Sequence, residues 1–371
     1  MQFGFSQEQD ELRRTVRAFL DQKSPETEVR RLMETDEGYD PAVWRQMGEQ
    51  LGLQGLAIPE ELGGSGYSFR ELAIVLEEMG RVLLAAPFFS SAVLAASALL
   101  HSGDDAAQKE LLPAVASGAT IATVAVAEDS GRWDVDSVEL AARRDGDGFA
   151  LSGTKSFVVD GLIADLILVV ARTAQGPSLF SVDGASPGLA RTSLFAMDQT
   201  RKLARLEFSD TPARLVGAGG AAAPMLERTL QLAAVGLAHE QLGGAQRCLE
   251  MATQYAKDRI QFGRPIGSFQ AVKHKCADML VAVELARSAA YYAAWCAATL
   301  DGDLPVAAAM AKSYCSEAYF SVAAENIQVH GGIGFTWEHP AHLYFKRAKS
   351  SELLFGDPLH HRRVLAAHIG I

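Results

Sequence analysis

The spacing of hydrophobic residues along this 371-residue chain changes twice, and this change constrains the fold more than any single motif. In residues 1–118 apolar side chains recur every three or four positions, as Leu72 and Leu76 do, which indicates amphipathic helices. Residues 119–216 instead carry short β-rich runs separated by glycine turns. Helical spacing returns in residues 223–371. The sequence therefore predicts a mainly α protein with a central β domain, and these three ranges as its domains.

The boundaries of the individual elements follow from caps and helix breakers. In the first range we expect helices at Phe5–Leu20, Pro41–Leu53, Phe69–Leu84, Phe88–His101 and Asp105–Ala116. In the last range we expect long helices at Pro224–Arg259, Ser268–Leu300 and Pro305–His330, followed by shorter ones. Long helices with short connections are typical of an antiparallel four-helix bundle. The middle range predicts an antiparallel barrel or sandwich.

Composition excludes several classes of function. The formal net charge of −11 argues against nucleic acid or an anionic membrane as the main partner, since phosphate binding needs clustered positive charge. The four cysteines form no CxxC pair, so we expect reduced thiols and no zinc. An uncharged run, Val82–Leu100, is interrupted by Pro87, which favours a buried helix over a membrane span. The acidic first residues do not resemble a signal peptide, and we expect a cytoplasmic protein.

The segment GAGGAA at 217–222 fits a dinucleotide-binding fingerprint only superficially. That motif requires a second parallel strand beyond its helix, whereas a helix of about 35 residues without such a strand follows here. We therefore interpret the segment as a flexible linker between the β region and the bundle. The paired histidines His360 and His361 do not have the spacing of metal ligands on one helix face, and no metal site is predicted.

Two motifs in the last range carry more information. In the first, Arg259 stands at the end of a long helix and precedes the turn QFGRPIGS. In the second, Gln328 precedes Gly331, Gly332 and Gly334 after another helix. Arginine recognises pyrophosphate through paired hydrogen bonds, and glycines allow a phosphate to approach bare N–H groups. Each motif alone also fits an ordinary helix end, but together in a helical–β–helical chain they are specific.

With these motifs, the chain resembles the acyl-CoA dehydrogenase family nearly from end to end. The likeness includes GLAIPEELGGSGYSFRELAIVLEEMGR near the start, LSGTKSFVVDG in the β region and AKSSELLFGDPLHHRR near the end. The resemblance implies a helical domain, a β domain and a helical bundle that assemble as a tetramer. It also implies an FAD cofactor bound between subunits, an acyl-CoA substrate and an electron-transfer protein as acceptor.

The resemblance also implies which residues hold FAD. Arg259 and Phe262 would reach the FAD of a neighbouring subunit. Gln328, Gly331 and Gly332 would lie along its pyrophosphate and adenosine part, with Gln270 close by. The segment flanking the isoalloxazine ring would comprise Ala127, Phe157, Val158 and Val159. Here the chain departs from the family, because Ala127 and Val159 stand where hydroxyl side chains are usual, so only backbone groups remain as donors.

A larger departure concerns the catalytic base that removes the α-proton of the thioester. Most family members supply a glutamate near the carboxy terminus, at a position that is Phe355 in this chain. Others supply it from the first bundle helix, at a position that is Ala233 here. Two acids remain close by in the sequence. Glu240 lies seven residues after Ala233, nearly on the same helix face, and Asp357 is expected to cap the helix that Pro358 opens.

Two hypotheses follow for the activity, the dehydrogenation of an acyl-CoA between its α and β carbons. In the first, the chain is a base-lacking subunit of a hetero-tetramer, and a related chain supplies the glutamate. In the second, the chain is a self-sufficient dehydrogenase with Glu240 as an unusual base. Another flavin oxidation on the same fold is a third alternative. The glycines Gly243 and Gly244 indicate close packing by flavin, acyl chain or a crossing helix, and with Ala233 they suggest a roomy acyl pocket.

Overall fold

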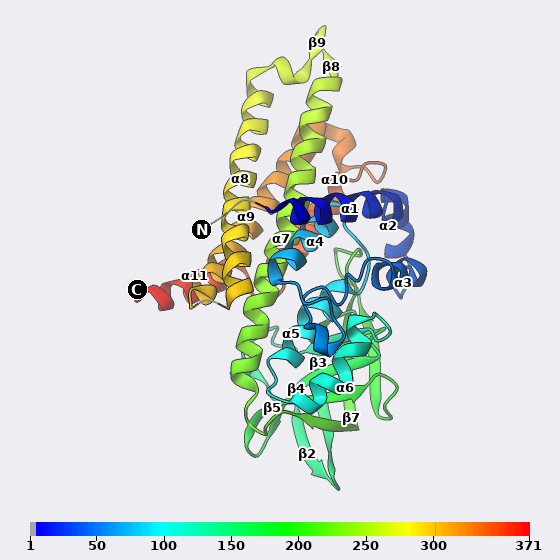
Figure 1. Cartoon of the computed structure of the whole chain (residues 1–371). Helices are drawn as coiled ribbons and strands as arrows, with labels where there is room; N and C mark the ends of the chain where they lie inside the picture. The colour runs from blue at the N-terminus through cyan, green and yellow to red at the C-terminus, as the bar shows by residue number, and fades with distance from the viewer. Residues whose placement is uncertain (1–4, 301) are drawn as a thin grey trace. The chain divides into compact units, whose positions relative to one another are not determined.

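The computed structural model describes residues 5–300 and 302–371 (Figure 1). The chain is mainly helical with a central β region, as the sequence predicts. It divides into two compact units. The helical unit comprises the chain up to Arg30, Phe69–Leu84 and Ala234–Ile371. The sheet unit comprises Arg31–Ser68 and Ala85–Ala233. The division into three domains along the sequence stays a prediction.

The helical unit is built mainly from long helices that pack along one another. It contains α1 (Gln7–Lys23), α4 (Phe69–Arg81), α8 (Gln270–Thr299), α9 (Leu304–His330), α10 (Ala341–Leu353), α11 (Pro358–Ile369) and the small hairpin β8 (Ile260–Gln261) and β9 (Arg264–Pro265). Helices α2 (Glu26–Met33) and α7 (Ala222–Asp258) belong partly to each unit. Alanines such as Ala290 on α8 and Ala311 on α9 are fully buried, so α8 and α9 pack closely. The hairpin β8–β9 joins α7 to α8 at one end of the bundle (Figure 1).

The sheet unit combines one mixed sheet with short helices. Its strands are β1 (Ala122–Ala125), β2 (Ala141–Asp145), β3 (Gly148–Val159), β4 (Leu166–Thr173), β5 (Gly176–Asp183), β6 (Leu189–Leu194) and β7 (Leu203–Val216). Its helices are α3 (Pro41–Glu49), the π-helical η2 (Phe89–Ala95), α5 (Ala96–Leu100) and α6 (Asp105–Ala116). Ile167 and Val169 of β4 and Phe180 of β5 are fully buried, which places the core against these strands.

The strand order is β1-β4-β2-β3-β7-β5, with β6 paired to β7 and β5 also paired to β4. The expectation of a purely antiparallel barrel or sandwich is wrong in one respect, because β1 pairs with β4 in parallel from Ala122 with Leu166 to Ala125 with Val169. Parallel strands need a long crossover. The β2–β3 hairpin lies in the chain between β1 and β4 and provides it. Turn spacing along the sequence does not reveal such a pairing.

Most expected elements are present with small shifts of their ends. Helix α6 has the predicted boundaries, and α4 begins at Phe69 as predicted. The structure adds helix α2, which lies outside every helix expected from the sequence. The segment 217–222 joins β7 to α7, as predicted, but it is not a flexible linker. Gly217 N donates to Asp104 Oδ2 (3.0 Å) and Gly220 N to Ser178 Oγ (2.8 Å), so the segment is a fixed turn.

Several simple features concern the whole described chain. Over residues 5–300 and 302–371, no helix is both long and apolar enough to cross a membrane. The four cysteines are free thiols. Within the same residues, no group of three or more histidine, cysteine or acidic side chains is arranged to hold a metal ion.

Candidate active site

The segment that follows β1 is tied to β3 in the sheet unit. Ser156 N donates to Ala127 O (2.8 Å), and Lys155 Nζ donates to Val126 O (2.8 Å). A register shift between β3 and β7 falls between Lys155 and Val158, and within it Phe157 has φ +59°. A non-glycine residue in this region is strained and is retained only where its surroundings enforce it. The bulge brings Phe157 to the surface of the sheet.

The predicted flavin-flanking residues divide into exposed and buried ones. Phe157 is 38% exposed, whereas Ala127, Val158 and Val159 are buried. The Val159 carbonyl already accepts a hydrogen bond from Thr123 Oγ1 (2.6 Å). The two valine side chains therefore pack inward, and only the Phe157 ring is presented to a ligand on this segment.

A buried ion pair supports the same segment. Lys155 is fully buried, and its ammonium lies 2.8 Å from Glu128 Oε1. Desolvation lowers the pKa of Lys155 to about 8. Burial alone would raise the pKa of Glu128, but hydrogen bonds from Lys155 and from the amides of Leu140 and Glu139 lower it overall. The pair thus links the end of β1 to β3 in its charged form. Sequence reasoning missed both residues, although Glu128 adjoins Ala127.

The arginine turn has a defined conformation in the helical unit. Helix α7 ends at Asp258, and Arg259 N still donates to Tyr255 O (2.8 Å). Phe262 (φ +53°) and Gly263 (φ +75°) are consecutive left-handed residues, as a tight hairpin turn requires. The Phe262 ring is 89% exposed and touches Phe269 edge-on. Gln270 opens α8, and its side-chain amide lies 2.9 Å from His274 Nε2.

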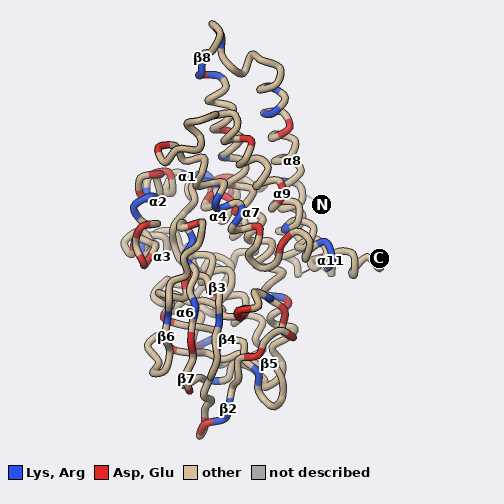
Figure 2. Tube along the Cα trace, turned by 180° about the vertical axis from the view of Figure 1, so that it is seen from behind, with Lys and Arg blue, Asp and Glu red and all other residues tan. Residues whose placement is uncertain are grey.

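Arg259 itself is exposed, and among residues 5–300 and 302–371 no carboxylate forms an ion pair with it. Figure 2 shows basic residues at the β8–β9 end of the bundle. A charged guanidinium without an internal partner is suited to an anionic group such as a pyrophosphate.

The structure brings the glycine-rich segment close to this turn. The Tyr255 ring, one turn before Arg259, lies against the His330 ring with centroids 4.3 Å apart. His330 is the last residue of α9, and Gly331 follows with φ +64°. A Cβ added at Gly331 or Gly332 would meet no atom within 4 Å. These glycines are therefore not required by packing within the chain. They leave open space beside exposed Gln328, which fits the approach of a large anionic cofactor.

The two positions where the resemblance expects the base carry no carboxylate. Phe355 is 4% exposed, has φ +61°, and lies between α10 and α11. Ala233 on α7 is fully buried. Asp357 accepts a hydrogen bond from His360 N (2.7 Å) and caps α11, which confirms the structural role predicted for it.

Glu240 lies on α7 where this helix crosses α4. Its side chain is buried, at 8% exposed. A Cβ on Gly80 of α4 would lie 2.0 Å from Glu240 O, so the two backbones are in contact. The crossing fixes the position of the Glu240 backbone within the helical unit.

The same crossing explains the glycines in α7. A Cβ on Gly243 would lie 1.8 Å from Glu77 O of α4, and one on Gly244 would lie 2.4 Å from the Tyr319 ring of α9. Of the three explanations that the sequence left open, crossing helices account for both residues. The suggestion that these glycines enlarge an acyl pocket is wrong, because α4 and α9 fill the space.

Sequence reasoning also missed a charged cluster beneath α4. Glu77 is 4% exposed and accepts hydrogen bonds from Arg13 Nη2 (3.0 Å), Arg287 Nη1 (3.1 Å) and Tyr291 Oη (3.1 Å). Burial would raise the pKa of Glu77, but the two guanidiniums lower it overall. The carboxylate joins α1, α4 and α8 at the place where α4 meets α7. The cluster brings together residues from three helices far apart in the sequence, so no local pattern indicates it.

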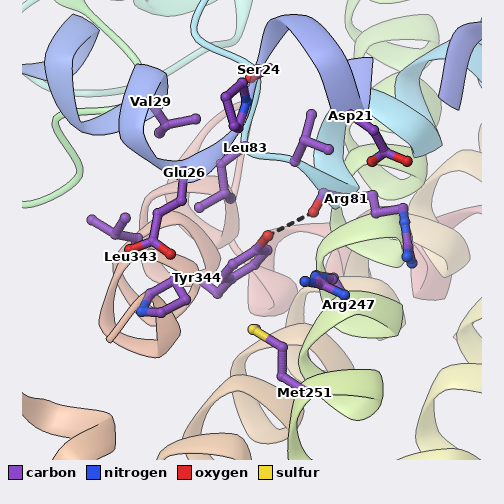
Figure 3. Close-up of a pocket in the computed structure, with 13 residues that line it drawn as sticks. Asp21, Ser24, Glu26, Val29, Arg81, Leu83, Arg247, Met251, Leu343 and Tyr344 are labelled. Atoms are coloured by element: carbon purple, nitrogen blue, oxygen red, sulfur yellow. Dashed lines mark hydrogen bonds between the residues drawn. The ribbon is translucent and has the colours of Figure 1, made fainter. Parts of the chain in front are cut away.

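The helical unit also encloses a pocket of about 360 Å³ (Figure 3). Arg81 and Arg247 line it, and Tyr344 Oη donates to Arg81 O (2.7 Å). Glu250 lies 2.6 Å from Arg81 and 3.6 Å from Arg247, so the two guanidiniums share its single negative charge. None of the residues predicted to bind FAD or to act as the base lines this pocket, and it is separate from the candidate cofactor residues.

Comparison with known proteins assigns the class of this fold and site. The acyl-CoA dehydrogenase N-terminal, middle and C-terminal domain models match residues 6–119, 123–211 and 221–370. The chain therefore belongs to the acyl-CoA dehydrogenase family, as its motifs indicate. Members of this family are FAD-dependent flavoproteins.

Individual relatives cover almost the whole chain. It is 38% identical over 352 residues to acyl-CoA dehydrogenase IpdE2 of Mycobacterium tuberculosis, covering 95% of this chain and 94% of the relative. It is 32% identical to a chain of the ChsE4-ChsE5 complex from Mycobacterium tuberculosis, with a TM-score of 0.90 over 100% of this chain and 99% of that chain. It is 34% identical to a chain of a variant of the Tcur3481-Tcur3483 steroid ACAD, with a TM-score of 0.88 and 98% of both chains covered.

Proposed function

We propose that this chain is a subunit of an FAD-dependent acyl-CoA dehydrogenase in which a homologous partner chain supplies the catalytic glutamate. The observation that carries the proposal is Phe355, a buried phenylalanine at the position where the resemblance expects the base. Ala233, at the alternative position, has no ionisable group either. A phenyl ring or a methyl group cannot accept the α-proton of a thioester.

The residues of this chain would serve the cofactor site. Arg259 would donate charged hydrogen bonds to the pyrophosphate of a neighbouring subunit's FAD, and Gly331 and Gly332 would allow it to approach the end of α9. In the sheet unit, the exposed Phe157 ring would flank an isoalloxazine ring, where Ala127 offers only backbone groups. Bound FAD supplies the acceptor for the hydride that leaves the β-carbon. The α-proton is accepted by the carboxylate of the partner chain.

The assembly is proposed to be a hetero-tetramer that passes electrons to an electron-transfer protein. Two similar structures, ChsE4-ChsE5 and Tcur3481-Tcur3483, are each described by two chain names, which supports a two-chain enzyme. The second of them is described as a steroid ACAD, and this supports a steroid-derived acyl-CoA as substrate.

A second candidate is a self-sufficient dehydrogenase with Glu240 as the base. The observation that favours it is an acidic residue on α7 whose backbone is held by the α4–α7 crossing and which is only 8% exposed. The two candidates differ in which chain must carry the functional carboxylate.

An activity assay separates the candidates. The purified chain is loaded with FAD, and flavin bleaching is followed with butanoyl-CoA, octanoyl-CoA and cholanoyl-CoA, with a dye as electron acceptor. Loss of general base assistance typically lowers the rate about 10²–10⁴-fold, so the chain alone should be inactive. Co-expression with a glutamate-bearing homologue should restore bleaching, and a Glu→Gln change in that homologue should abolish it.

Glu240→Gln provides the matched comparison. In the two-chain enzyme this substitution should leave the bleaching rate of the co-expressed complex within about threefold of the parent, far less than the loss of a general base. Turnover by the isolated chain that stops with Glu240→Gln would overturn the subunit proposal and identify Glu240 as the base. An assembly that never retains FAD would overturn both candidates.

A further inference from the structure

Lys312 of α9 is a fully buried lysine that the proposed reaction does not use. Its Nζ donates to Ser316 Oγ (3.1 Å), Glu352 O (3.0 Å) and Gly356 O (3.0 Å). In its protonated form the amine has three donor hydrogens, so these three acceptors match the full capacity of the ammonium group. Two of the acceptors are backbone carbonyls on either side of Phe355.

The segment held in this way is conformationally unusual. Glu352 belongs to the last turn of α10, whose carbonyls lack partners within the helix. Phe355 (φ +61°) and Gly356 (φ +102°) then follow in a backbone region that side chains rarely adopt. The segment ends at Asp357, the cap of α11. Such a conformation persists only where contacts outside the segment enforce it.

A second side chain holds the same segment. His361 Nε2 lies 3.1 Å from Phe355 O, and in the tautomer with a proton on Nε2 it donates to that carbonyl. The carbonyls of Glu352, Phe355 and Gly356 are thus all bound by buried side chains. Two different helices, α9 and α11, supply these donors.

The contacts of Lys312 continue to α7. Gln241 Nε2 donates to Ser316 Oγ (2.9 Å), and Ser316 in turn accepts from Lys312. Gln241 adjoins Glu240, so one buried polar chain links the α7 residue beside the second candidate base to the segment around Phe355. Buried polar networks whose members are all satisfied favour a single local conformation.

We propose that Lys312 is a positioning residue, which holds the segment Leu354–Gly356 so that the Phe355 ring forms a fixed wall for the acyl group. This inference rests on the proposed function, in which Phe355 stands at the position where the resemblance expects the base that faces the acyl chain. The wall is apolar and rigid, and it determines which acyl groups fit. His361 assists by holding the Phe355 carbonyl.

The chemistry of the site argues against a purely space-filling role. A methionine would occupy a similar volume without the large desolvation cost of a buried ammonium. It would leave the carbonyls of Glu352 and Gly356 without their donor, and unsatisfied buried carbonyls drive the segment toward other conformations.

Hydrogen exchange of the FAD-loaded complex tests the positioning directly. The Leu354 amide donates to Ser350 O (3.2 Å) and the Gly356 amide to Leu353 O (3.3 Å), so both report on the segment. In Lys312→Met both amides should exchange at least about tenfold faster, because local opening becomes easier. Lys312→Gln keeps two donor hydrogens, so both amides should exchange at rates between those in Lys312→Met and those in the parent. Val16→Ala, in the core of α1, is the control for general destabilisation and should leave these two amides unchanged.

Acyl-CoA binding tests the consequence for specificity. Kd values for octanoyl-CoA and cholanoyl-CoA are measured from the perturbation of the flavin spectrum, without turnover. In Lys312→Met the ratio of the two Kd values should change by at least about threefold, a difference of roughly 0.6 kcal/mol. In Val16→Ala this ratio should stay constant.

The outcomes separate this inference from the proposed function. If exchange at the Leu354 and Gly356 amides is unchanged in Lys312→Met, Lys312 does not position this segment. That conclusion holds whether or not the complex is an active dehydrogenase. If the segment loosens but the ratio of Kd values stays constant, Phe355 does not form the acyl wall. If the parent complex retains FAD but binds no acyl-CoA, the proposed function fails, and with it the acyl wall. If Lys312→Met does not fold, His361→Phe removes a donor from the same segment and is judged by the same two measurements.

Discussion

Gly243 of α7 lies directly against the backbone carbonyl of Glu77 of α4, so closely that a Cβ on Gly243 would come within 1.8 Å of that oxygen. Gly80 of α4 makes the reciprocal contact with Glu240 O of α7. The Glu77 side chain is bound by Arg13 and Arg287, which restrains α4 against a shift. The crossing of α4 and α7 therefore fixes the backbone at Glu240, the second candidate base.

Gly243→Ala should destabilise the protein by about 1–3 kcal/mol, the usual cost of overpacking. Helix propensity alone would favour alanine by about 1 kcal/mol, so a loss of stability would identify the crossing as its cause. The free energy of unfolding is measured in urea. Gly332→Ala is the control, since a Cβ there meets no atom within 4 Å. Equal stability of parent and Gly243→Ala would show that α4 moves aside at little cost.

Arg259→Ala should weaken FAD retention by about 1.5–3 kcal/mol, the range for a hydrogen bond to a charged group. The measurement is the flavin absorbance of the oligomer after dialysis against increasing salt. Arg14→Ala, an exposed arginine of α1, is the control and should retain FAD as the parent does. Unchanged retention in Arg259→Ala would show that the exposed guanidinium does not bind the cofactor.

Lys155→Met should lower the free energy of unfolding by about 3 kcal/mol, because it leaves the largely buried Glu128 carboxylate without its partner. Arg132→Ala removes one member of the exposed Arg132–Asp134 pair and should cost less than about 1 kcal/mol. Both variants are compared by urea unfolding at pH 7. If both lose the same stability, the buried pair has no special role in joining β1 to β3.

The stability of the parent relative to Lys312→Met should rise with pH. Desolvation lowers the pKa of Lys312 to about 7 in the folded chain, with the charges of Glu352, Cys315 and Asp357 opposing the shift. Between pH 7 and the ordinary lysine pKa near 10.5, the unfolded chain then binds one more proton than the folded chain. The difference in unfolding free energy should increase by up to about 1.4 kcal/mol per pH unit in that window.

Urea unfolding of both proteins at pH 7, 8 and 9 checks this slope. Below pH 7 lysine is protonated in both the folded and the unfolded chain, so the difference in unfolding free energy should not change with pH there. If the difference in unfolding free energy also stays constant above pH 7, Lys312 remains protonated in the folded chain, held by its three acceptors.

The arginine turn illustrates how far sequence reasoning reaches in the candidate site. The turn residues that follow Arg259 predict a helix end there, and α7 does end at Asp258. The open space at Gly331 and Gly332 agrees with the interpretation of these glycines as a place of close approach. The inward packing of Val158 and Val159 does not follow from the sequence, because the bulge at Phe157 changes which side of β3 each residue faces.

The sequence by itself determined the order of helical and β regions, the approximate positions of most helices, the family and the absence of a carboxylate at Phe355 and Ala233. These are local properties, since the period, the caps, the turns and the residue types are written along the chain. Only the tertiary structure decided the parallel pairing of β1 with β4, the helices that fill the space beside Gly243 and Gly244, and the buried partners of Glu77, Lys155 and Lys312. Each of these depends on contacts between residues distant in sequence, where burial and the need to satisfy every polar group select one arrangement among many.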